Sequence, residues 1–564
     1  MNQMSGAEAV VTMLQRYGVR HVFGLCGDTS LPIYDAFYRL DHGITHVLTR
    51  DERSAAYMAD AYARVTGRVG VCEGPSGGGA TYILPGVVEA NESSIPVLAL
   101  TTDIGVSSRG RHVLTELDQK ALFRPLTKWN DVVLQAEQIP RTFRRAFRAM
   151  TTGRPGAVHL GLPFDVQKQP VDEALLFADP RHQACPAEPV APDPEAVERL
   201  VEALLAAADP VIVCGGGPVI AGAFAELQHL AERLAIPVAT SISGKGAIAE
   251  THPLCIGVVG SNGGVPETRA LIDAADSILF IGCRAGSVTT ERWRHPPSRG
   301  KRILHIDVDP EVIGTNYETE AALVGDARLA LAAVNAVLDR EGIAAPERTL
   351  DQAKIAAMRE AKFAGFQKLA TSDETPIRPE RVVATLARHL PEEAVVVADP
   401  GTPCPYLSAY LQLARAGRQF ISNRAHGALG YSLPAVVGAK IGRPEARCVA
   451  VMGDGSFGFA CGEMETIQRL GLPVTLIVIS NAAFGWIKAG QRSGFDQRYF
   501  SVDFTAGRHA AIARAFGIEA FEVDQPGALD LAMQQALTAD HPTLIDIACQ
   551  PLHEARAPVS EWIA

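Results

Sequence analysis

The chain has 564 residues, of which 47% are hydrophobic and 20% charged, and this predicts a globular protein of roughly three to four domains. Its net charge of −11 argues against nucleic acid as a partner, and the lack of an apolar run long enough to span a bilayer argues against a membrane protein. The first residues show no signal-peptide pattern and the ten cysteines include no CxxC pair, so we expect a cytoplasmic protein that binds a small molecule.

Short runs rich in Val and Ile alternate with helical patterns along the chain, which predicts an α/β fold of parallel sheets covered by helices. The first block, residues 1-180, contains the strand-like runs HVLTR, VGVCEG, PVLALTT and AVHLGLP. The pattern ERSAAYMADAYARV, which follows HVLTR, is helical. It places Glu52 in the first turn of that helix and makes Asp51 a capping or surface residue.

A linker rich in Pro and Ala leads to a second block, residues 190-340, with the strand-like runs PVIVCGGG, PVATS, SILFIGC and RILHIDVDP. Gly215, Gly216 and Gly217 follow the first of these strands. Ile220 stands where a GxGxxG pattern needs its third Gly, so NAD binding is only weakly supported. Packing is the alternative role for these glycines.

A charged helical connector precedes the third block, residues 375-564, with the runs AVVVADPG, CVAVMGDG, VTLIVIS and TLIDIAC. The second and third of these runs flank the helical pattern FACGEMETIQRL. We therefore predict a right-handed βαβ unit whose two strands lie side by side. Asp454 and Asn481 follow the carboxyl ends of those strands, where doubly wound sheets bind ligands.

The oxygen atoms expected at this sheet edge suit a magnesium ion. A carboxylate from Asp454, an amide oxygen from Asn481 and the backbone carbonyl of Ala483 would bind Mg²⁺ if a phosphate completed its octahedron. Three residues of the same turn are candidates for contact with that phosphate: Gly453, Gly455 and Ser456. On spacing alone, an Asp-Gly turn and an unrelated Asn at a strand end explain these residues equally well.

The MGDG turn with its downstream Asn resembles the signature of thiamine diphosphate (ThDP)-dependent enzymes. Four further stretches are similar to the acetolactate synthase large-subunit-like group of that superfamily: RDERSAAYMADAYARVTGRVGVCEGPSGGG, GRPGAVHLGLPFDVQ, ILHIDVDPEVIGTNYE and GALGYSLPAVVGAK. The resemblance covers nearly the whole chain. It implies a pyrimidine-binding, a middle and a diphosphate-binding domain, with ThDP and Mg²⁺ as cofactors. It also implies a homodimer with shared active sites, or a tetramer.

Several residue roles follow from the resemblance alone. Glu52 occupies the position of the activating glutamate, which shares a proton with the aminopyrimidine ring. Leu429 matches the bulky apolar residue that holds the two cofactor rings in a bent shape. Gly401 and Thr402 match residues that hold the diphosphate, and Gly427 lies in the turn next to the cofactor. In some relatives the middle domain binds FAD, in others ADP or nothing, so FAD stays open.

The pocket for the second substrate departs from the pattern of that group. The chain has LTE at residues 114–116 where acetolactate synthases have Phe-Gln-Glu, and GDT at 27–29 in place of Gly-Gly-Ala. The acceptor therefore need not be a second pyruvate. Five side chains are candidates for substrate contact: Asp28, His112, Thr115, His426 and Trp486.

The resemblance implies decarboxylation of a 2-oxo acid, with transfer of the acyl unit to an acceptor carbonyl, as in acetolactate synthases. Simple 2-oxo acid decarboxylation, or a 2-hydroxyacyl-CoA lyase or oxalyl-CoA decarboxylase activity, stays open. A different class is also open, because GPSGG satisfies the GxSxG pattern of a serine hydrolase with Ser76 as nucleophile. That reading leaves Glu52, Asp454 and Asn481 without a role.

Overall fold

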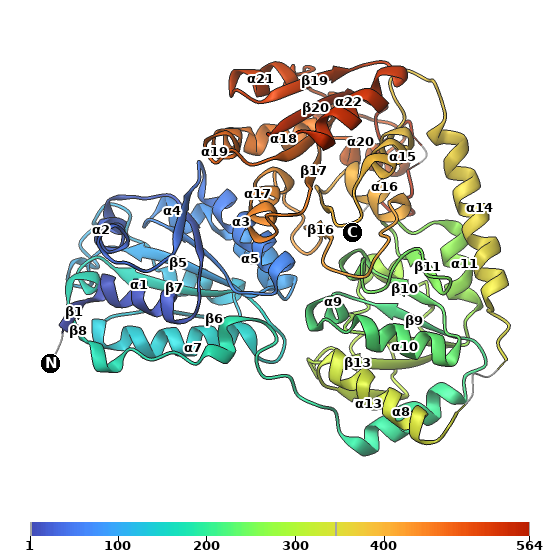
Figure 1. Cartoon of the computed structure of the whole chain (residues 1–564), viewed down its shortest axis with the longest axis horizontal. Helices are drawn as coiled ribbons and strands as arrows, with labels where there is room; N and C mark the ends of the chain where they lie inside the picture. The colour runs from blue at the N-terminus through green and yellow to red at the C-terminus, as the bar shows by residue number, and fades with distance from the viewer. Residues whose placement is uncertain (1–2, 344–346, 556, 563–564) are drawn as a thin grey trace. The chain divides into compact units, whose positions relative to one another are not determined.

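Three parallel sheets organise the chain. The computed structural model describes residues 3–343, 347–555 and 557–562, and within these ranges it contains three six-stranded sheets whose strands are all parallel (Figure 1). Helices cover the sheets, because each βαβ connection returns the chain over one face of its sheet. The predicted α/β fold with three parallel sheets is confirmed. Each sheet falls within one predicted domain range, although the boundaries themselves stay predictions.

The first sheet has the strand order β3-β2-β4-β5-β7-β6. Its strands are β2 His21–Gly24, β3 Thr45–Leu48, β4 Gly70–Gly74, β5 Val97–Asp103, β6 Trp129–Val132 and β7 Val158–Pro163. The helices of this block are α1 Gly6–Arg16, α2 Leu31–Arg39, α3 Glu52–Thr66, α4 Gly78–Tyr82, α5 Leu84–Glu92, α6 Gln119–Phe123 and α7 Ile139–Thr151. A short antiparallel pair joins β1 (Gln3–Ser5) to β8 (Pro170–Asp172). Helices α1 and α7 lie side by side over a shared apolar core (Figure 1).

The middle sheet has the order β11-β10-β9-β12-β13-β14. Its strands are β9 Pro210–Cys214, β10 Val238–Thr240, β11 Cys255–Val258, β12 Ser277–Ile281, β13 Arg302–Asp307 and β14 Ala321–Val324. Its helices are α8 Pro194–Leu205, α9 Gly217–Ala221, α10 Phe224–Leu234, α11 Pro266–Ala274, α12 Ser287–Thr290 and α13 Ala327–Arg340. The predicted connector is the long helix α14 (Gln352–Ala370), which packs against α11 and α15 (Pro379–His389) (Figure 1).

The third sheet has the order β16-β15-β17-β18-β20-β19. Its strands are β15 Val395–Ala398, β16 Phe420–Ser422, β17 Cys448–Gly453, β18 Val474–Ser480, β19 Glu519–Val523 and β20 Thr543–Ala548. Its helices are α15 Pro379–His389, α16 Pro403–Tyr410, α17 Ser432–Gly442, α18 Asp454–Ala460, α19 Met464–Arg469, α20 Gly485–Gly494, α21 His509–Ala515 and α22 Pro526–Thr538. The predicted single helix after β17 is thus two helices, α18 and α19, joined by a short 3₁₀ turn.

Within the three parallel sheets, six strands have no counterpart among the predicted runs: β2, β6, β11, β14, β16 and β19. All of them except β2 lie at the edge of a sheet. An edge strand is covered less completely than a central one, so it need not carry a continuous apolar run. The partly exposed residues of β14 and β19 illustrate this weaker signal.

The chain forms two compact units, which do not follow the three sheets. The first unit combines three separate segments: residues 1–188, 423–445 and 460–472. The second unit contains the remaining segments: 189–422, 446–459 and 473–564. Two pieces of the third block therefore belong to the same unit as the first sheet. Among the described residues, none of the helices combines the length and apolar character that crossing a bilayer requires.

Helix α17 is the piece of the third block that packs most extensively on the first block, and its partner is α3. The contact is very close at Gly438, where a Cβ atom would lie 2.0 Å from the backbone oxygen of Met58. That oxygen belongs to the backbone of α3 and cannot rotate away as a side chain could. A glycine at position 438 is therefore required for the two helices to approach this closely.

We expect Gly438→Ala to destabilise the protein by about 1–3 kcal/mol, because the added methyl must push α17 away from α3. Gly365, in the middle of α14, is a matched control, because a Cβ there meets nothing within 4 Å. Gly365→Ala should be neutral or stabilising by about 0.5–1 kcal/mol. Differential scanning calorimetry of both variants checks this pair, and equal melting temperatures would contradict the proposed contact.

Candidate active site

The pairing of β17 with β18 brings Asp454 and Asn481 together. The two strands are parallel and in register up to Gly453 and Ile479, so both end at the same edge of the sheet. Asp454 is buried and begins α18, five residues before the helical pattern that starts at Phe459. Its Oδ2 atom accepts hydrogen bonds from the backbone N–H groups of Asn481 (2.8 Å) and Ala482 (2.6 Å). The predicted juxtaposition is therefore present.

The oxygen atoms at this edge have unused capacity for a cation. The Oδ1 atom of Asp454 accepts one hydrogen bond, from the N–H of Gly455 at 2.8 Å, and keeps a free lone pair. The side-chain Oδ1 of Asn481 is buried and has no hydrogen-bond partner. A buried oxygen without a donor next to a buried carboxylate is a pair of groups that a cation could satisfy. Burial raises the pKa of the Asp454 carboxyl, while the three backbone donors lower it.

The chain after Asn481 leaves the sheet through a sharp turn. Ala482 has a φ of 55°, a left-handed conformation that reverses the backbone, and its carbonyl accepts the N–H of Phe504 at 3.0 Å. The N–H of Phe484 donates to Val502, so the hydrogen bonds of this segment lie on both sides of the buried Ala483. This arrangement fits the predicted role of the Ala483 carbonyl as a metal ligand, which stays a prediction.

The predicted diphosphate residues lie on neighbouring loops of the third sheet. Thr402 is buried at the start of α16, and its Oγ1 would lie 3.6 Å from a Cβ on Gly485. Gly401 before it has a φ of 97°, which side chains rarely tolerate, and open space in the direction of a Cβ. Gly453 likewise faces open space, whereas a Cβ on Gly455 would meet the ring of Phe484 at 2.9 Å. The open space beside Gly401 and Gly453 would let a phosphate approach the backbone there.

Glu52 is the first residue of α3, and the side chain of Asp51 caps that helix through the N–H of Arg53. The Glu52 side chain is buried against Gly74, where a Cβ would lie 3.2 Å from its Cγ. Burial raises the pKa of the Glu52 carboxyl, with a smaller lowering from its own backbone N–H. A carboxyl in such an environment holds a proton more readily than a solvated one.

The corner between β3 and α3 is held by a residue that sequence reasoning missed. Glu463 is buried, and its Oε1 accepts the backbone N–H of Arg50 at 2.8 Å. Its other oxygen accepts the hydroxyl of Thr466 at 2.7 Å. Glu463 belongs to the segment 460–472, which is part of the first unit. The buried carboxylate of Glu463 holds the backbone at Arg50, two residues before Glu52 in the chain. It thus restrains the position of the predicted activating residue.

The turn that carries Leu429 lies in the first unit as well. Gly427 and Gly430 both have positive φ values, 72° and 84°, and the side-chain amide of Asn423 donates to the carbonyl of Ala428 at 2.7 Å. Leu429 is half-buried, while His426 is exposed. Glu52 and the Leu429 turn therefore belong to one compact unit, although the first lies in the first predicted domain and the second in the third.

Four hydroxyl groups form a continuous chain beside the predicted substrate residues. Thr115 lies 2.7 Å from Ser76, Ser76 lies 3.1 Å from Thr29, and Thr29 lies 2.7 Å from Thr102, each measured between hydroxyl oxygens. Thr115 has a φ of 68°, which is strained for a β-branched residue. Strain of this kind is found mainly at functional sites. Asp28 is exposed and accepts the N–H of Thr29 at 2.8 Å.

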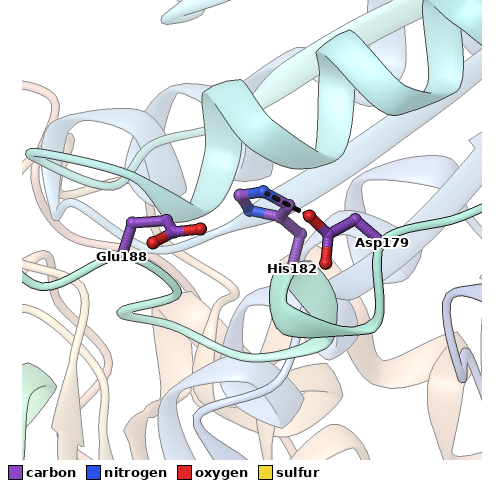
Figure 2. Close-up of side chains that lie close together, drawn as sticks. All are labelled: Asp179, His182 and Glu188. Carbon is purple, nitrogen blue, oxygen red and sulfur yellow. Dashed lines mark ion pairs between the residues drawn. The ribbon is translucent and has the colours of Figure 1, made fainter.

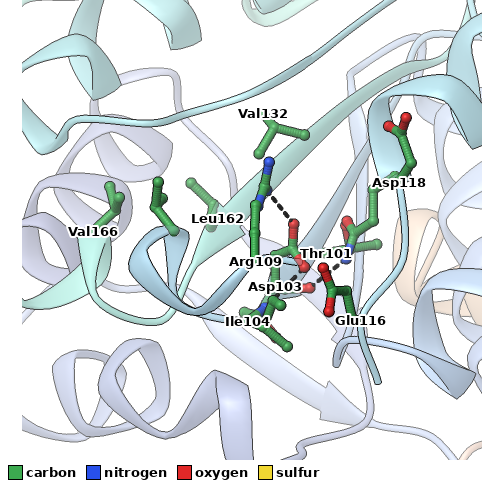
Figure 3. A network of polar contacts seen from close by, with 12 residues as sticks. Thr101, Asp103, Ile104, Arg109, Glu116, Asp118, Val132, Leu162 and Val166 are labelled. Atoms are coloured by element: carbon green, nitrogen blue, oxygen red, sulfur yellow. Dashed lines mark hydrogen bonds and ion pairs between the residues drawn. The ribbon is translucent and has the colours of Figure 1, made fainter. Parts of the chain in front are cut away.

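A second set of polar contacts ties down the loop that carries His112 and Thr115 (Figure 3). Arg109 forms an ion pair of 2.6 Å with Asp103, a buried residue at the end of β5. Glu116 accepts the backbone N–H of Gly110 at 2.5 Å, which closes the loop on itself. The loop is therefore held near Ser76, while the His112 side chain remains exposed.

The chain matches known proteins over most of its length. Residues 4–122, 197–334 and 399–547 match the N-terminal TPP binding domain, the central domain and the C-terminal TPP binding domain of the thiamine pyrophosphate enzymes. The chain belongs to the thiamine pyrophosphate enzyme family. It is thus a ThDP-dependent enzyme, which confirms the predicted family and the predicted ThDP cofactor.

Several relatives of this thiamine pyrophosphate enzyme are acetolactate synthases. A probable acetolactate synthase large subunit of Methanococcus aeolicus is 34% identical over 97% of this chain and 92% of the relative. Acetolactate synthase isozyme 3 large subunit of Escherichia coli is 32% identical over 95% and 93%, respectively. The acetolactate synthase of Arthrospira platensis is 30% identical over 97% and 94%.

The hydrolase reading gains no support in this thiamine pyrophosphate enzyme. Ser76 is buried, and the hydroxyl partners of its side chain are Thr29 and Thr115. A nucleophilic serine needs a base such as histidine within hydrogen-bond reach. Within the described part of the chain, no histidine hydrogen-bonds to Ser76. The hydroxyls around it suit substrate binding better than nucleophilic attack.

Residues behind the metal candidates were not found from the sequence. Asp546, on β20, accepts the hydroxyl of Ser480 at 2.5 Å and the backbone N–H of His509 at 3.0 Å. The ring Nδ1 of His509 lies 3.1 Å from the Ser480 hydroxyl. Because Ser480 directly precedes Asn481, these contacts fix the end of β18. A charged residue inside the apolar run TLIDIA was the available signal.

Trp486 and the glycines of the middle domain all make contacts within the protein. The indole N–H of Trp486 donates to the carbonyl of Trp562 at 3.0 Å, so this ring is held by the C-terminal segment. A Cβ on Gly215 would lie 2.1 Å from the carbonyl oxygen of Gly282, and one on Gly217 would lie 2.5 Å from its Cα. Gly215 and Gly217 are needed for close packing where β9 and β12 end. Their presence does not support FAD binding by the middle domain.

One cluster has a metal-like composition but already contains a cation. Ligand atoms of Asp179, His182 and Glu188 lie within 4.8 Å of one another (Figure 2). The guanidinium of Arg181 pairs with Asp179 at 2.6 Å and with Glu188 at 2.7 Å. The positive charge that these carboxylates need is therefore supplied by a side chain, and the cluster provides no case for a metal.

The raised pKa of Glu52 predicts a pH-dependent cost to stability. The folded state keeps the Glu52 proton to higher pH than the unfolded state does. The free energy of unfolding therefore falls as the pH rises above about 4.5, the ordinary pKa of this carboxyl. We expect cofactor-free Glu52→Gln to melt about 2 °C or more above the wild type at neutral pH. The difference in melting temperature should vanish at a pH below the carboxyl pKa of the unfolded state. Thermal melts across this pH range check the sign. A variant less stable at every pH would contradict it.

Proposed function

We propose that the chain uses ThDP and Mg²⁺ to decarboxylate a 2-oxo acid and to join the resulting acyl unit to an acceptor carbonyl. The acetolactate synthase relatives support this reaction class. The observation that carries the proposal is the pair formed by Asp454 and Asn481: a carboxylate aligned by three backbone N–H groups beside a buried amide oxygen without a donor. Such a donor set suits Mg²⁺ with diphosphate oxygens as further ligands.

We propose a separate role in this reaction for each predicted site residue. ThDP supplies an electron sink that makes cleavage of a bond next to a carbonyl possible. We propose that Glu52 holds a proton at its buried carboxyl and shares it with the aminopyrimidine ring. Leu429 would support the bent shape of the cofactor, and Thr402 with Gly401 would contact the diphosphate. As the resemblance implies, we also expect a homodimer or tetramer with shared sites.

The hydroxyl chain favours an acceptor with a polar oxygen. Thr29 donates to Ser76, and the 2.7 Å contact between Ser76 and Thr115 can be donated by either hydroxyl. We propose that Ser76 is the donor when substrate is bound, which leaves the hydrogen of the Thr115 hydroxyl available to a substrate oxygen. Acceptor carbonyls and carboxylates present such an oxygen. We propose that Thr115 replaces the Gln expected in acetolactate synthases and so alters which acceptor is used.

The first test of this function combines a substrate panel with a metal-site variant. Purified protein with ThDP and MgCl₂ should release CO₂ from at least one 2-oxo acid and form a coupled product when an aldehyde or second oxo acid is added. Asp454→Ala should lower Mg²⁺-dependent ThDP affinity about tenfold to a hundredfold and abolish turnover, because the metal loses its carboxylate. Asp530→Ala, which removes a partly exposed acid of the same unit that pairs with Arg388, is the control.

The outcomes separate the alternatives. Release of CO₂ without a coupled product would indicate a simple decarboxylase. Activity on a 2-hydroxyacyl-CoA but on none of the 2-oxo acids would indicate a lyase. An unchanged ThDP dissociation constant in Asp454→Ala would overturn the metal site.

The second test concerns acceptor choice. We expect Thr115→Gln to raise the share of acetolactate formed from pyruvate by about tenfold, because it restores the side chain of the acetolactate synthase group and breaks the hydroxyl chain. Thr115→Ser keeps the hydroxyl and should leave the product distribution near that of the wild type. Chromatography of products from pyruvate, alone and with competing aldehydes, measures the ratio. Identical ratios in all three proteins would show that residue 115 does not determine specificity.

A further inference from the structure

A buried arrangement of charges lies beside the turn that carries Leu429. Arg64, on α3, donates to Asp60 on the same helix at 2.8 Å and to Glu89 on α5 at 3.1 Å. Both acids are fully buried, and the side chain of Arg64 is 12% exposed. Two carboxylates therefore share one guanidinium in the interior of the first unit.

Each acid also holds one end of the turn. Glu89 accepts the backbone N–H of His426 at 2.7 Å, just before the turn. Asp60 accepts the hydroxyl of Tyr431, which is fully buried just after the turn. Leu429 lies between these two anchors. The turn of the third block is thus tied at both ends to acids of the first block.

The charge balance makes the turn and the acids dependent on each other. With one guanidinium for two carboxylates, Glu89 needs further donors, and it obtains them from the N–H of His426 and the hydroxyl of Ser93 at 2.7 Å. A buried carboxylate that loses a donor carries a large desolvation penalty. Displacement of the turn would remove that donor, so the acids hold the turn in one position.

We propose that Glu89, bridged to Asp60 by Arg64, is a positioning residue that sets the turn bearing Leu429 for contact with the cofactor. This inference rests on the proposed function for the role of Leu429. Glu89 acts on the backbone of the turn and touches no reacting atom. The anchor at Tyr431 performs the same task from the other side.

The first readout is amide hydrogen exchange of the cofactor-free protein. Glu89→Gln keeps the shape of the side chain but sets an NH₂ group against the donors around it, and Tyr431→Phe removes one hydroxyl. In both variants we expect exchange in the turn 425–430 to become about tenfold faster or more, while the strands of the first sheet keep their protection. Glu92→Gln, on the same helix as Glu89, is the control and should leave exchange unchanged.

The second readout is exchange of the ThDP C2 proton for deuterium in the loaded enzyme. Glu89→Gln and Tyr431→Phe should slow it about tenfold or more, because the supporting turn is displaced. The ThDP dissociation constant should stay within about threefold of the wild type, since the proposed diphosphate and metal ligands belong to the second unit.

Each outcome decides the proposal. Faster turn exchange together with slower C2 exchange in both variants, but not in Glu92→Gln, supports it. Unchanged turn exchange overturns the anchor, and faster exchange throughout the first unit overturns it in favour of a general structural role. Faster turn exchange with unchanged C2 exchange overturns the link to the cofactor. If the wild type binds no ThDP, the proposed function fails and takes that link with it, whereas the amide data still report on the anchor.

Discussion

The parallel pairing of neighbouring strands is the constraint on which the candidate site depends. In a parallel sheet all strands deliver their carboxyl ends to one edge, so residues far apart in sequence meet there without any specific attraction. The in-register pairing of β17 with β18 places Asp454 next to the backbone of Asn481 in this way. The backbone N–H groups that align the carboxylate are a consequence of strand geometry, and the side-chain oxygen of Asn481 is buried without a donor.

Sequence reasoning succeeded where the signal was local. Continuous apolar runs identified the central strands, because such strands are buried on both faces and tolerate little else. The start of α3 at Glu52 could be predicted from a capping aspartate followed by a helical pattern. The approach of Asp454 to Asn481 was also predictable, since the two strands of a βαβ unit usually lie side by side. The edge strands β6 and β19 were missed because their residues are partly polar.

Contacts between distant segments could not be predicted from the residues themselves. The sequence around Glu463 does not indicate that its carboxylate accepts the N–H of Arg50. That contact depends on how a segment of the third block packs on the first block. The same is true of Thr115, whose strained backbone appears only in three dimensions. Glu89 reads as an ordinary helix residue, and its burial beside Arg64 comes from packing alone. These contacts therefore depend on the packing of distant segments, which a local sequence pattern does not specify.

The discontinuous first unit has a consequence for biosynthesis. Its first segment ends at residue 188, and the next begins at 423, so residues 189–422 must be translated before α17 can cover α3. At typical ribosomal speeds this delay is on the order of ten seconds or more. During that interval the nascent chain exposes the face of α3 that α17 later covers, and Asp60 and Glu89 lack their hydrogen-bond donors on the Leu429 turn. Slow codons or truncations within the intervening region would prolong that exposure, and would reduce the yield of folded enzyme without altering a single residue of the site.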